Sequence, residues 1–205
     1  MKGPKHSAKR QHLVEATRRI ATTRGLQSAN IRTVAEEANV SPATVLYYFE
    51  SKEELFHGAI SSILEEFYER RLRIMDRSDD ARVRLVTMIY EGIPDRVPEE
   101  MRVLLEVTSM SPSMPQLQPY LMSIVEKQIN LYFTIIEIGS GLGVFHPTPN
   151  SFTVARNLIA LEDAYDLYPV FGLNQNRQDV RDGVLSYAEL ALNVDLKAVR
   201  PVLGT

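Results

Sequence analysis

The chain of 205 residues contains no cysteine, and this absence excludes disulfide bonds and thiolate metal sites. No apolar run approaches the roughly 18–20 residues that span a bilayer. The first residues are polar and basic, unlike the apolar core of a signal peptide. We therefore expect a cytoplasmic protein with no membrane partner. Hydrophobic residues make up 44% and charged residues 24%, which is typical of an ordinary folded protein.

The sequence also has none of the common catalytic or metal-binding motifs. Its four histidines show no HExxH or comparable ligand spacing, and no Gly-x-Ser-x-Gly occurs. The glycine run from 139 to 143 lacks both the GxGxxG spacing and the Walker lysine, so we interpret it as a helix stop followed by a loop. We expect no enzyme, no cofactor and no metal.

Charge is distributed unevenly along the chain, whose net charge is −3. Residues 1–52 hold nine basic and four acidic residues, a balance of +5, whereas the remainder has a balance of −8. A basic segment joined to an acidic one is typical of a protein that places one end against phosphate. A chance asymmetry on a solvated surface is the alternative on charge alone.

Apolar residues recur with helical spacing almost throughout, and no segment alternates as a strand would. The pattern predicts an all-α fold of about nine helices. Gly25 ends the first helix, Asn30 and Ser41 are suitable N-caps for the next two, and Pro42 opens the third. The expected helices cover residues 8–24, 31–38, 42–49, 52–75, 81–92, 99–110, 118–138, 151–168 and 179–194.

Residues 31–52 are the most informative segment. Two short helices joined by a turn of about four residues have the geometry of a helix-turn-helix. The outer face of the second helix carries Thr44, Tyr47 and Tyr48, whose hydroxyls and rings can contact phosphates and base edges. The small or branched residues that would let the two helices cross closely are Val34, Ala35, Ala38, Val40, Val45 and Leu46.

Residues 9–55 resemble the N-terminal domain of the TetR family of transcriptional regulators. The order and spacing of the shared residues match without gaps over about 45 positions, about a quarter of the chain. The rest of the chain resembles the family in length and helical character. The matching residues are Arg24, Gly25, Ile31, Arg32, Val34, Ala35, Glu36, Glu37, Ala38, Val40, Ser41, Ala43, Thr44, Tyr47, Tyr48, Phe49, Ser51, Lys52 and Leu55.

Three positions depart from the family pattern. Leu46 occupies a position where the family often has tyrosine, so one aromatic phosphate contact is lost or moves to Tyr47. Asn39 replaces the usual glycine of the turn, and asparagine tolerates the left-handed backbone there. Asn30 and Thr33 do not form the common Thr-x-x-Asp/Glu capping box. We expect the fold to be unaffected.

The resemblance implies a helix-turn-helix DNA-binding domain over residues 1–52 and a helical effector-binding and dimerisation domain over residues 53–205. It also implies a homodimeric repressor of double-stranded operator DNA, released when a small molecule moves the fourth helix. A DNA-binding factor without an effector is the alternative, and a helical enzyme is a more remote one. For Tyr48 the alternative is packing beneath Phe49. The expected DNA-binding residues are Lys5, Lys9, Arg32, Ser41, Pro42, Ala43, Thr44, Tyr47, Tyr48 and Lys52.

The resemblance places the effector pocket between the fourth helix and the four helices expected at 81–92, 99–110, 118–138 and 151–168. The residues there make it mainly apolar and aromatic, and methionine suits a tolerant pocket. The expected ligand-binding residues are Phe67, Met88, Tyr90, Glu106, Met110, Tyr132, Phe133, Leu158, Glu162 and Asp166.

Glu162 and Asp166 stand four positions apart on one helix face, where like charges disfavour each other. A cationic ligand held by carboxylate and aromatic groups would explain the pair. A salt bridge from Arg156, Arg177 or Arg181, or simple exposure to water, would explain it equally. An apolar, neutral or weakly anionic effector is the favoured interpretation.

The last two helices are expected to pair with their symmetry mates into a four-helix dimer interface. The apolar face of the final helix is broader than one partner helix needs. The alternative is a C-terminal helix buried within its own subunit. The expected interface residues are Val184, Leu185, Tyr187, Ala188, Ala191 and Leu192.

Overall fold

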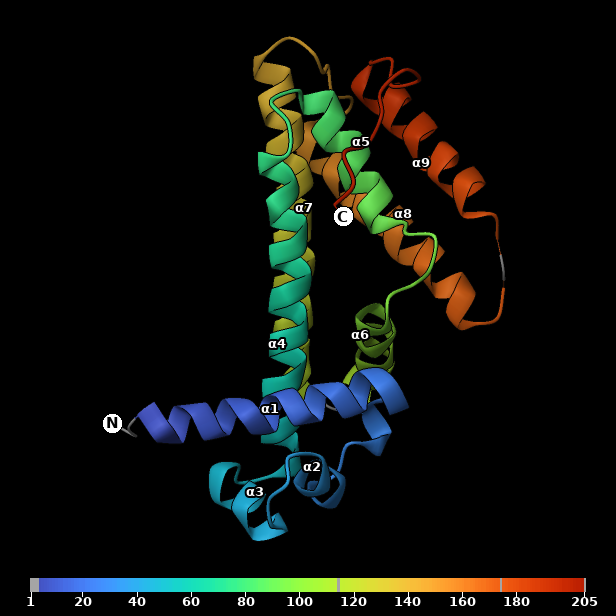
Figure 1. Cartoon of the computed structure of the whole chain (residues 1–205). Coiled ribbons are helices and arrows are strands. Elements are labelled where there is room, and N and C mark those ends of the chain that lie inside the picture. Colours follow the sequence, from blue (N-terminus) through green and yellow to red (C-terminus); the bar gives the residue numbers. More distant parts are fainter. Residues whose placement is uncertain (1–3, 114, 174, 205) are drawn as a thin grey trace. The chain divides into compact units, whose positions relative to one another are not determined.

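The structure is a computed structural model that describes residues 4–113, 115–173 and 175–204 (Figure 1). The regular secondary structure of these residues is entirely helical, as the periodicity predicts. The helices are α1 (Pro4–Arg24), α2 (Ile31–Glu37), α3 (Pro42–Tyr48), α4 (Lys52–Leu72), α5 (Ala81–Gly92), α6 (Glu99–Met110), α7 (Gln118–Gly141), α8 (Ser151–Val170) and α9 (Arg177–Leu192).

Local hydrogen bonds explain where the short helices begin. The Asn30 side chain accepts the backbone N–H groups of Arg32 and Thr33, and the Thr33 hydroxyl accepts the N–H of Asn30 at 2.9 Å. This reciprocal capping is not the common Thr-x-x-Asp/Glu box, as expected, but Asn30 and Thr33 fill its two roles. Ser41 caps α3 by accepting the N–H of Thr44 at 3.1 Å.

Several longer helices differ from the expected bounds. Helix α1 begins at Pro4 instead of residue 8, and α4 ends at Leu72, where a tighter turn follows. The glycine run is partly helical, since α7 continues through Gly139. A β-carbon on that glycine would overlap the ring of Phe145, so glycine permits the close packing. Helix α9 ends because Asn193 adopts a left-handed backbone with φ 48°.

The chain forms two compact units. The first comprises the residues up to Phe67 together with Glu99–Leu121, and the second comprises Tyr68–Pro98 and the residues from Met122 onward. Helix α6 therefore packs in the first unit, although it lies between two segments of the second along the chain. The functional division expected after residue 52 stays a prediction.

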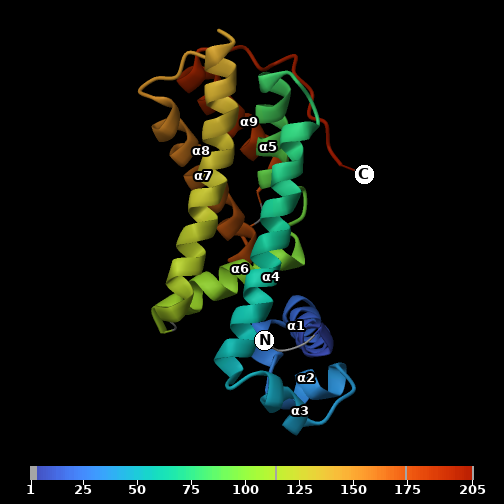
Figure 2. The ribbon, with the colours of Figure 1, turned by 90° about the vertical axis from the view of Figure 1, so that its left-hand side faces the viewer.

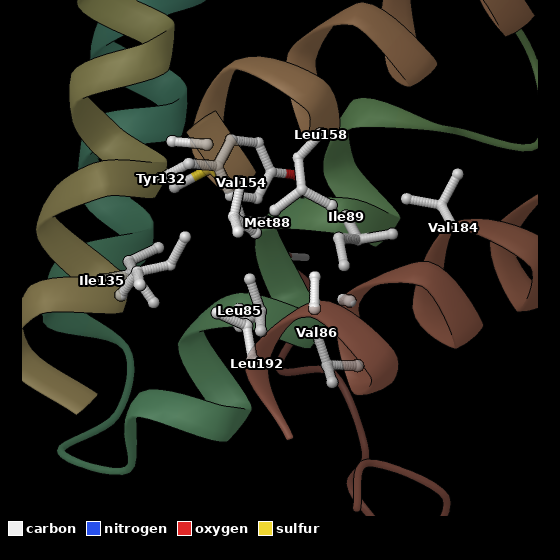
Figure 3. Close-up of a cluster of buried hydrophobic side chains, with 14 of the residues drawn as sticks. Leu85, Val86, Met88, Ile89, Tyr132, Ile135, Val154, Leu158, Val184 and Leu192 are labelled. Atoms are coloured by element: carbon white, nitrogen blue, oxygen red, sulfur yellow. The ribbon is translucent and has the colours of Figure 1, made fainter. Parts of the chain in front are cut away.

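Each unit has its own buried core. In the first, α2 and α3 pack against each other beside α1 (Figure 2), and Leu13, Val34 and Val45 are fully buried. In the second, side chains of α5, α7, α8 and α9 form one cluster (Figure 3). Its labelled members are Leu85, Val86, Met88, Ile89, Tyr132, Ile135, Val154, Leu158, Val184 and Leu192.

Candidate functional site

Helices α2 and α3 form the helix-turn-helix expected from the sequence. Asn39 makes the turn between them with φ 51°, a left-handed backbone that asparagine accepts more readily than most residues. Val34, Ala35 and Val45 are buried at the crossing of the two helices. This packing orients α3 so that its opposite face stays exposed, as a recognition helix requires.

The exposed face of α3 carries an aromatic pair. The Tyr47 side chain is 73% exposed, and its ring centroid lies 5.1 Å from that of Tyr48 in an edge-to-face arrangement. Tyr48 is half-buried and also contacts His6 of α1, at a centroid distance of 4.6 Å. Phe49, by contrast, is buried beneath the guanidinium of Arg10, 4.6 Å away. Among the described residues, the ring contacts of Tyr48 are therefore with Tyr47 and His6, and not with Phe49.

The expected basic residues differ in their exposure and in their partners. The Lys52 ammonium lies 4.7 Å from the Phe56 ring centroid, and Lys9 is half-buried. Arg32 is well exposed and pairs with Glu36 at 3.1 Å. The side chain of Lys5 lies outside the described part of the structure. The remaining expected residues Ser41, Pro42 and Ala43 are exposed at the start of α3, and Thr44 is half-buried.

A buried polar junction lies in the second unit, where four helices meet at one carboxylate. Arg71 of α4 donates to Glu162 of α8 at 2.9 and 3.3 Å, and the Tyr132 hydroxyl of α7 donates to the same carboxylate. Gly92 of α5 faces it so closely that a β-carbon would overlap the carboxylate atoms. The Arg71 and Glu162 side chains are only 2% and 4% exposed.

Burial dominates the electrostatics of this junction. It raises the pKa of the Glu162 carboxyl, although the Arg71 charge and the hydrogen bonds from Arg71 and Tyr132 act in the opposite direction. Burial and the adjacent Glu162 charge likewise raise the pKa of the Tyr132 phenol well above its ordinary value. Within this site the phenol therefore acts as a hydrogen-bond donor at neutral pH.

Asp166 has a partner of its own. Arg177 donates to its carboxylate at 2.6 Å and also donates to the carbonyl oxygens of Pro94 and Tyr165. Burial raises the pKa of Asp166 to about 6 despite this bond. Of the explanations left open for the Glu162 and Asp166 pair, the salt bridge holds for both. The expected Arg177 serves Asp166, whereas the partner of Glu162 is Arg71, which the sequence reasoning missed.

Glu106 serves neither of these clusters. Its carboxylate accepts the backbone N–H of Leu26 at 2.8 Å and lies close to Gly25, whose φ of 83° allows the approach. On the same helix, the Met110 sulfur accepts from the Gln27 amide at 3.3 Å. The acid of α6 thus binds the connection between α1 and α2 within the first unit. Contact of Glu106 or Met110 with an effector stays a prediction.

The ten expected ligand-binding residues are divided between the two units. Phe67, Glu106 and Met110 belong to the first unit, and the others belong to the second. Met88, Tyr132 and Leu158 lie together in the buried cluster of the second unit, and Tyr90 and Phe133 pack against it. The structure therefore brings some of the expected ligand-binding residues together in the second unit, which also holds Glu162, and it does not bring together all ten.

The expected dimer residues fall mostly inside the subunit. Val184, Ala188, Ala191 and Leu192 are buried in the cluster of their own chain, and Leu185 and Tyr187 are half-buried. Figure 3 shows Val184 and Leu192 within that cluster. The four buried residues follow the alternative expectation of a helix packed within its own subunit. Other apolar side chains of α8, of α9 and of the connection between them are exposed, and the sequence did not single them out. They are Phe152, Leu167, Phe171, Leu173 and Leu190.

Metal clusters and membrane spans are both absent from the described part of the chain. Among residues 4–113, 115–173 and 175–204, no group of three or more histidines or acids is arranged to hold a metal ion. Within the same ranges, no helix is both long and apolar enough to cross a membrane.

Comparison with known proteins identifies the helix-turn-helix region. Residues 13–59 match the family model described as bacterial regulatory proteins, tetR family. Residues of the chain are 36% identical over 74 positions to the HTH-type nicotine-responsive transcriptional repressor HdnoR of Paenarthrobacter nicotinovorans, covering 36% of the chain and 38% of that protein. The chain thus spans less than half the length of that curated relative, and 43% of the regulator PksA of Bacillus subtilis.

Longer similarities extend over nearly the whole chain at lower identity. The uncharacterised regulator YfiR of Bacillus subtilis is 24% identical over 200 residues, covering 94% of the chain and 95% of that protein. A TetR regulator from Haloarcula marismortui has TM-score 0.79 and 24% identity, over 91% of the chain and 99% of that structure. A Saccharomonospora viridis regulator in complex with choline has TM-score 0.79 and 23% identity, over 91% and 98% respectively. Residues 13–59 are thus similar to the tetR family of bacterial regulatory proteins, and nearly the whole chain shares the fold of solved TetR regulators.

Proposed function

We propose that the protein is a homodimeric repressor that binds a near-palindromic operator through α3 and leaves it when a small molecule binds the second unit. The observation that carries the proposal is the exposed face of α3, held outward by the buried crossing with α2. Tyr47 and Thr44 on that face supply a ring and a hydroxyl for a major groove. Ligand release is a population shift, in which the effector prefers the spacing of recognition helices that does not fit DNA.

The proposed DNA contacts divide into two classes. Lys52, together with Thr44, Tyr48, Lys5 and Lys9, binds phosphates, whereas Tyr47, with Arg32 and Ala43, faces bases or their immediate backbone. Lys52→Ala should weaken binding to every duplex and lower the salt slope by about one unit. Tyr47→Ala should reduce discrimination between duplexes more than general affinity. Gel-shift titrations at several salt concentrations test both, and unchanged shifts for both variants would contradict the assignment.

The effector is proposed to bind among α4, α5, α7 and α8, where Arg71, Gly92, Tyr132 and Glu162 converge. Buried charges with shifted pKa values cluster at functional sites more often than elsewhere. The names of two similar proteins mention nicotine response and a choline complex. In this chain, however, Glu162 is already neutralised by Arg71. We therefore favour an apolar effector that is neutral or weakly anionic over a cation.

Operator release provides the test of effector class. A panel of neutral, anionic and cationic amphiphiles is added to the complex of the protein with the duplex it selects from a random pool. Release by neutral or anionic compounds supports the proposal. Release by cations alone, abolished by Glu162→Gln with the dimer intact, would establish the cation interpretation instead. Glu106→Gln is the second test variant of the cation interpretation, and Glu137→Gln, at an exposed position of α7, is the control.

The dimer is proposed to form through α8 and α9, with a revised set of contacts. The exposed side chains Phe152 and Leu167 of α8 and Leu190 of α9 are better placed for a partner than the buried residues named from sequence, since Leu190 is 83% exposed. Sedimentation at micromolar concentration should give about twice the 23.2 kDa mass. Leu190→Glu should lower the association constant, and a monomeric parent would rule the model out.

A DNA-binding factor without an effector is the second candidate. The nucleoid occlusion factor SlmA of Vibrio vulnificus, named for a role in nucleoid occlusion, is 29% identical over 107 residues, covering 51% of the chain and 55% of that protein. Thermal-shift screening of metabolites, with and without the selected duplex, separates the two. A factor of this kind would bind DNA and show no metabolite that both stabilises it and releases the duplex.

A further inference from the structure

A histidine of α1 closes an aromatic cluster with the two tyrosines of α3. The His6 ring lies 4.6 Å from Tyr48 and 6.2 Å from Tyr47, measured between ring centroids, and the two tyrosine rings lie 5.1 Å apart. The three rings therefore contact one another pairwise, at distances and angles that favour aromatic attraction. The contact joins the first turns of α1 to the recognition helix, 41 and 42 positions later in the chain.

Ring contact is the interaction that holds His6 in this position. Its Nε2 atom is buried, and among the described residues it has no hydrogen-bond partner. His12, further along the same helix, differs because its Nε2 lies 3.1 Å from the carbonyl oxygen of Ala38. A phenyl ring at position 6 would keep the aromatic contacts of the imidazole. The substitution would break no hydrogen bond between Nε2 and a described residue.

We propose that His6 is a positioning residue for DNA recognition, which fixes the rings of Tyr47 and Tyr48 in the orientation that the operator requires. This inference rests on the proposed DNA-binding function. Tyr47 is otherwise largely surrounded by solvent, so its ring would have to be ordered on binding at an entropic cost. The contact with His6 orders the pair before DNA arrives.

Three variants test the proposal: His6→Ala, His6→Phe and, as a matched control, Gln11→Ala on the same helix. Gln11 is exposed and its side chain bonds only Glu15 within the described residues. The probes are the duplex enriched by the parent protein from a random-sequence pool and a scrambled duplex of equal composition. His6→Ala should weaken binding to the enriched duplex roughly 3- to 10-fold, the loss expected for one aromatic pair. It should weaken binding to the scrambled duplex by a smaller factor, because the two duplexes share only the phosphate contact of Tyr48.

His6→Phe should bind both duplexes within about twofold of the parent, because it keeps the ring contacts. Rescue by phenylalanine separates positioning from a direct contact of the imidazole with DNA. Equal discrimination by His6→Ala and the parent would overturn the proposal, and so would a His6→Phe variant as weak as His6→Ala. Melting temperatures within about 2 °C of the parent exclude general unfolding, since one kcal/mol corresponds to roughly 2–4 °C in a chain of this size. If the parent enriches no duplex, the proposed function itself fails.

Discussion

Replacing Glu162 by alanine should destabilise the protein by about 3–5 kcal/mol, because the substitution leaves the buried Arg71 guanidinium without its carboxylate. The two side chains are 2% and 4% exposed, so water screens the remaining charge very little. Arginine cannot lose its proton to escape the penalty. A typical domain has a stability of only about 5–15 kcal/mol, so the loss is a large fraction of the total. The melting temperature should fall by roughly 6–20 °C.

Urea unfolding followed by circular dichroism measures this loss, and two further variants show its origin. Replacing both partners, as Arg71→Met with Glu162→Leu, removes both charges and should recover at least half of the lost stability. Glu162→Gln keeps an oxygen that can accept from Arg71 and Tyr132, so its loss should be intermediate. A loss below about 1 kcal/mol in Glu162→Ala, as expected for an exposed pair, would refute the reasoning. So would a double variant less stable than the single one.

Substitutions at three other positions should change the free energy of unfolding measured in the same assay. Gly92→Ala should lower the free energy of unfolding by about 1–3 kcal/mol, because its β-carbon would overlap the Glu162 carboxylate. In the control Gly141→Ala the β-carbon meets nothing within 4 Å, so this variant should be near neutral. Equal losses in the two variants would contradict the packing at Gly92. Glu106→Ala should cost about 1–3 kcal/mol by leaving the amide of Leu26 without its acceptor, and Glu106→Gln should cost less. Because burial raises the pKa of Asp166 to about 6 in the folded state, the folded protein binds the extra proton, and the contribution of Asp166 to stability should fall as pH rises from about 4 to about 6. The Asp166→Asn variant should lack this fall. The same pH dependence of stability in the variant and in the parent would contradict the prediction.

The helix-turn-helix could be predicted because its determinants are local. The cap of α3 joins Ser41 to Thr44, three positions apart, and the turn uses the left-handed backbone of Asn39. The capping of α2 by Thr33 is likewise local, and its hydroxyl takes the place of the family's usual carboxylate. Both partners of such an interaction lie within a few positions of each other, so a short stretch of sequence is enough to recognise it.

Partners far apart in sequence could not be chosen in this way. Glu106 and Leu26 are 80 positions apart, and the acceptor of that bond is recognised only once α6 packs in the first unit. The apolar spacing of α9 predicts a dimer interface, whereas Val184 and Leu192 are buried where α9 packs against α5 and α8 of the same chain. Burial within a subunit and burial between subunits require the same apolar spacing, so the periodicity of one helix does not distinguish them.

The buried charges nevertheless carry a signal in their spacing. Arg71 follows Ile63 and Phe67 at intervals of four, and so continues the buried stripe of α4. Glu162 follows Val154 and Leu158 at the same interval on α8. A charge on an apolar stripe needs an opposite charge or another polar partner within reach, because burial without a partner is too costly.

This rule predicts that the stripe charges pair, but it does not predict which ones. Arg181 also lies on a buried stripe, with Val184 and Ala188, and it donates to Asp95 at 2.8 Å and to the carbonyl oxygen of Ile93 at 3.0 Å. Arg177, one turn earlier, reaches Asp166 instead. Which acid pairs with which arginine depends on where along their lengths the helices contact each other. Only the packing of the core determines these contact points. The spacing of charges on helical stripes therefore indicates that Arg71 is buried and paired, whereas the packing of the core decides that its partner is Glu162.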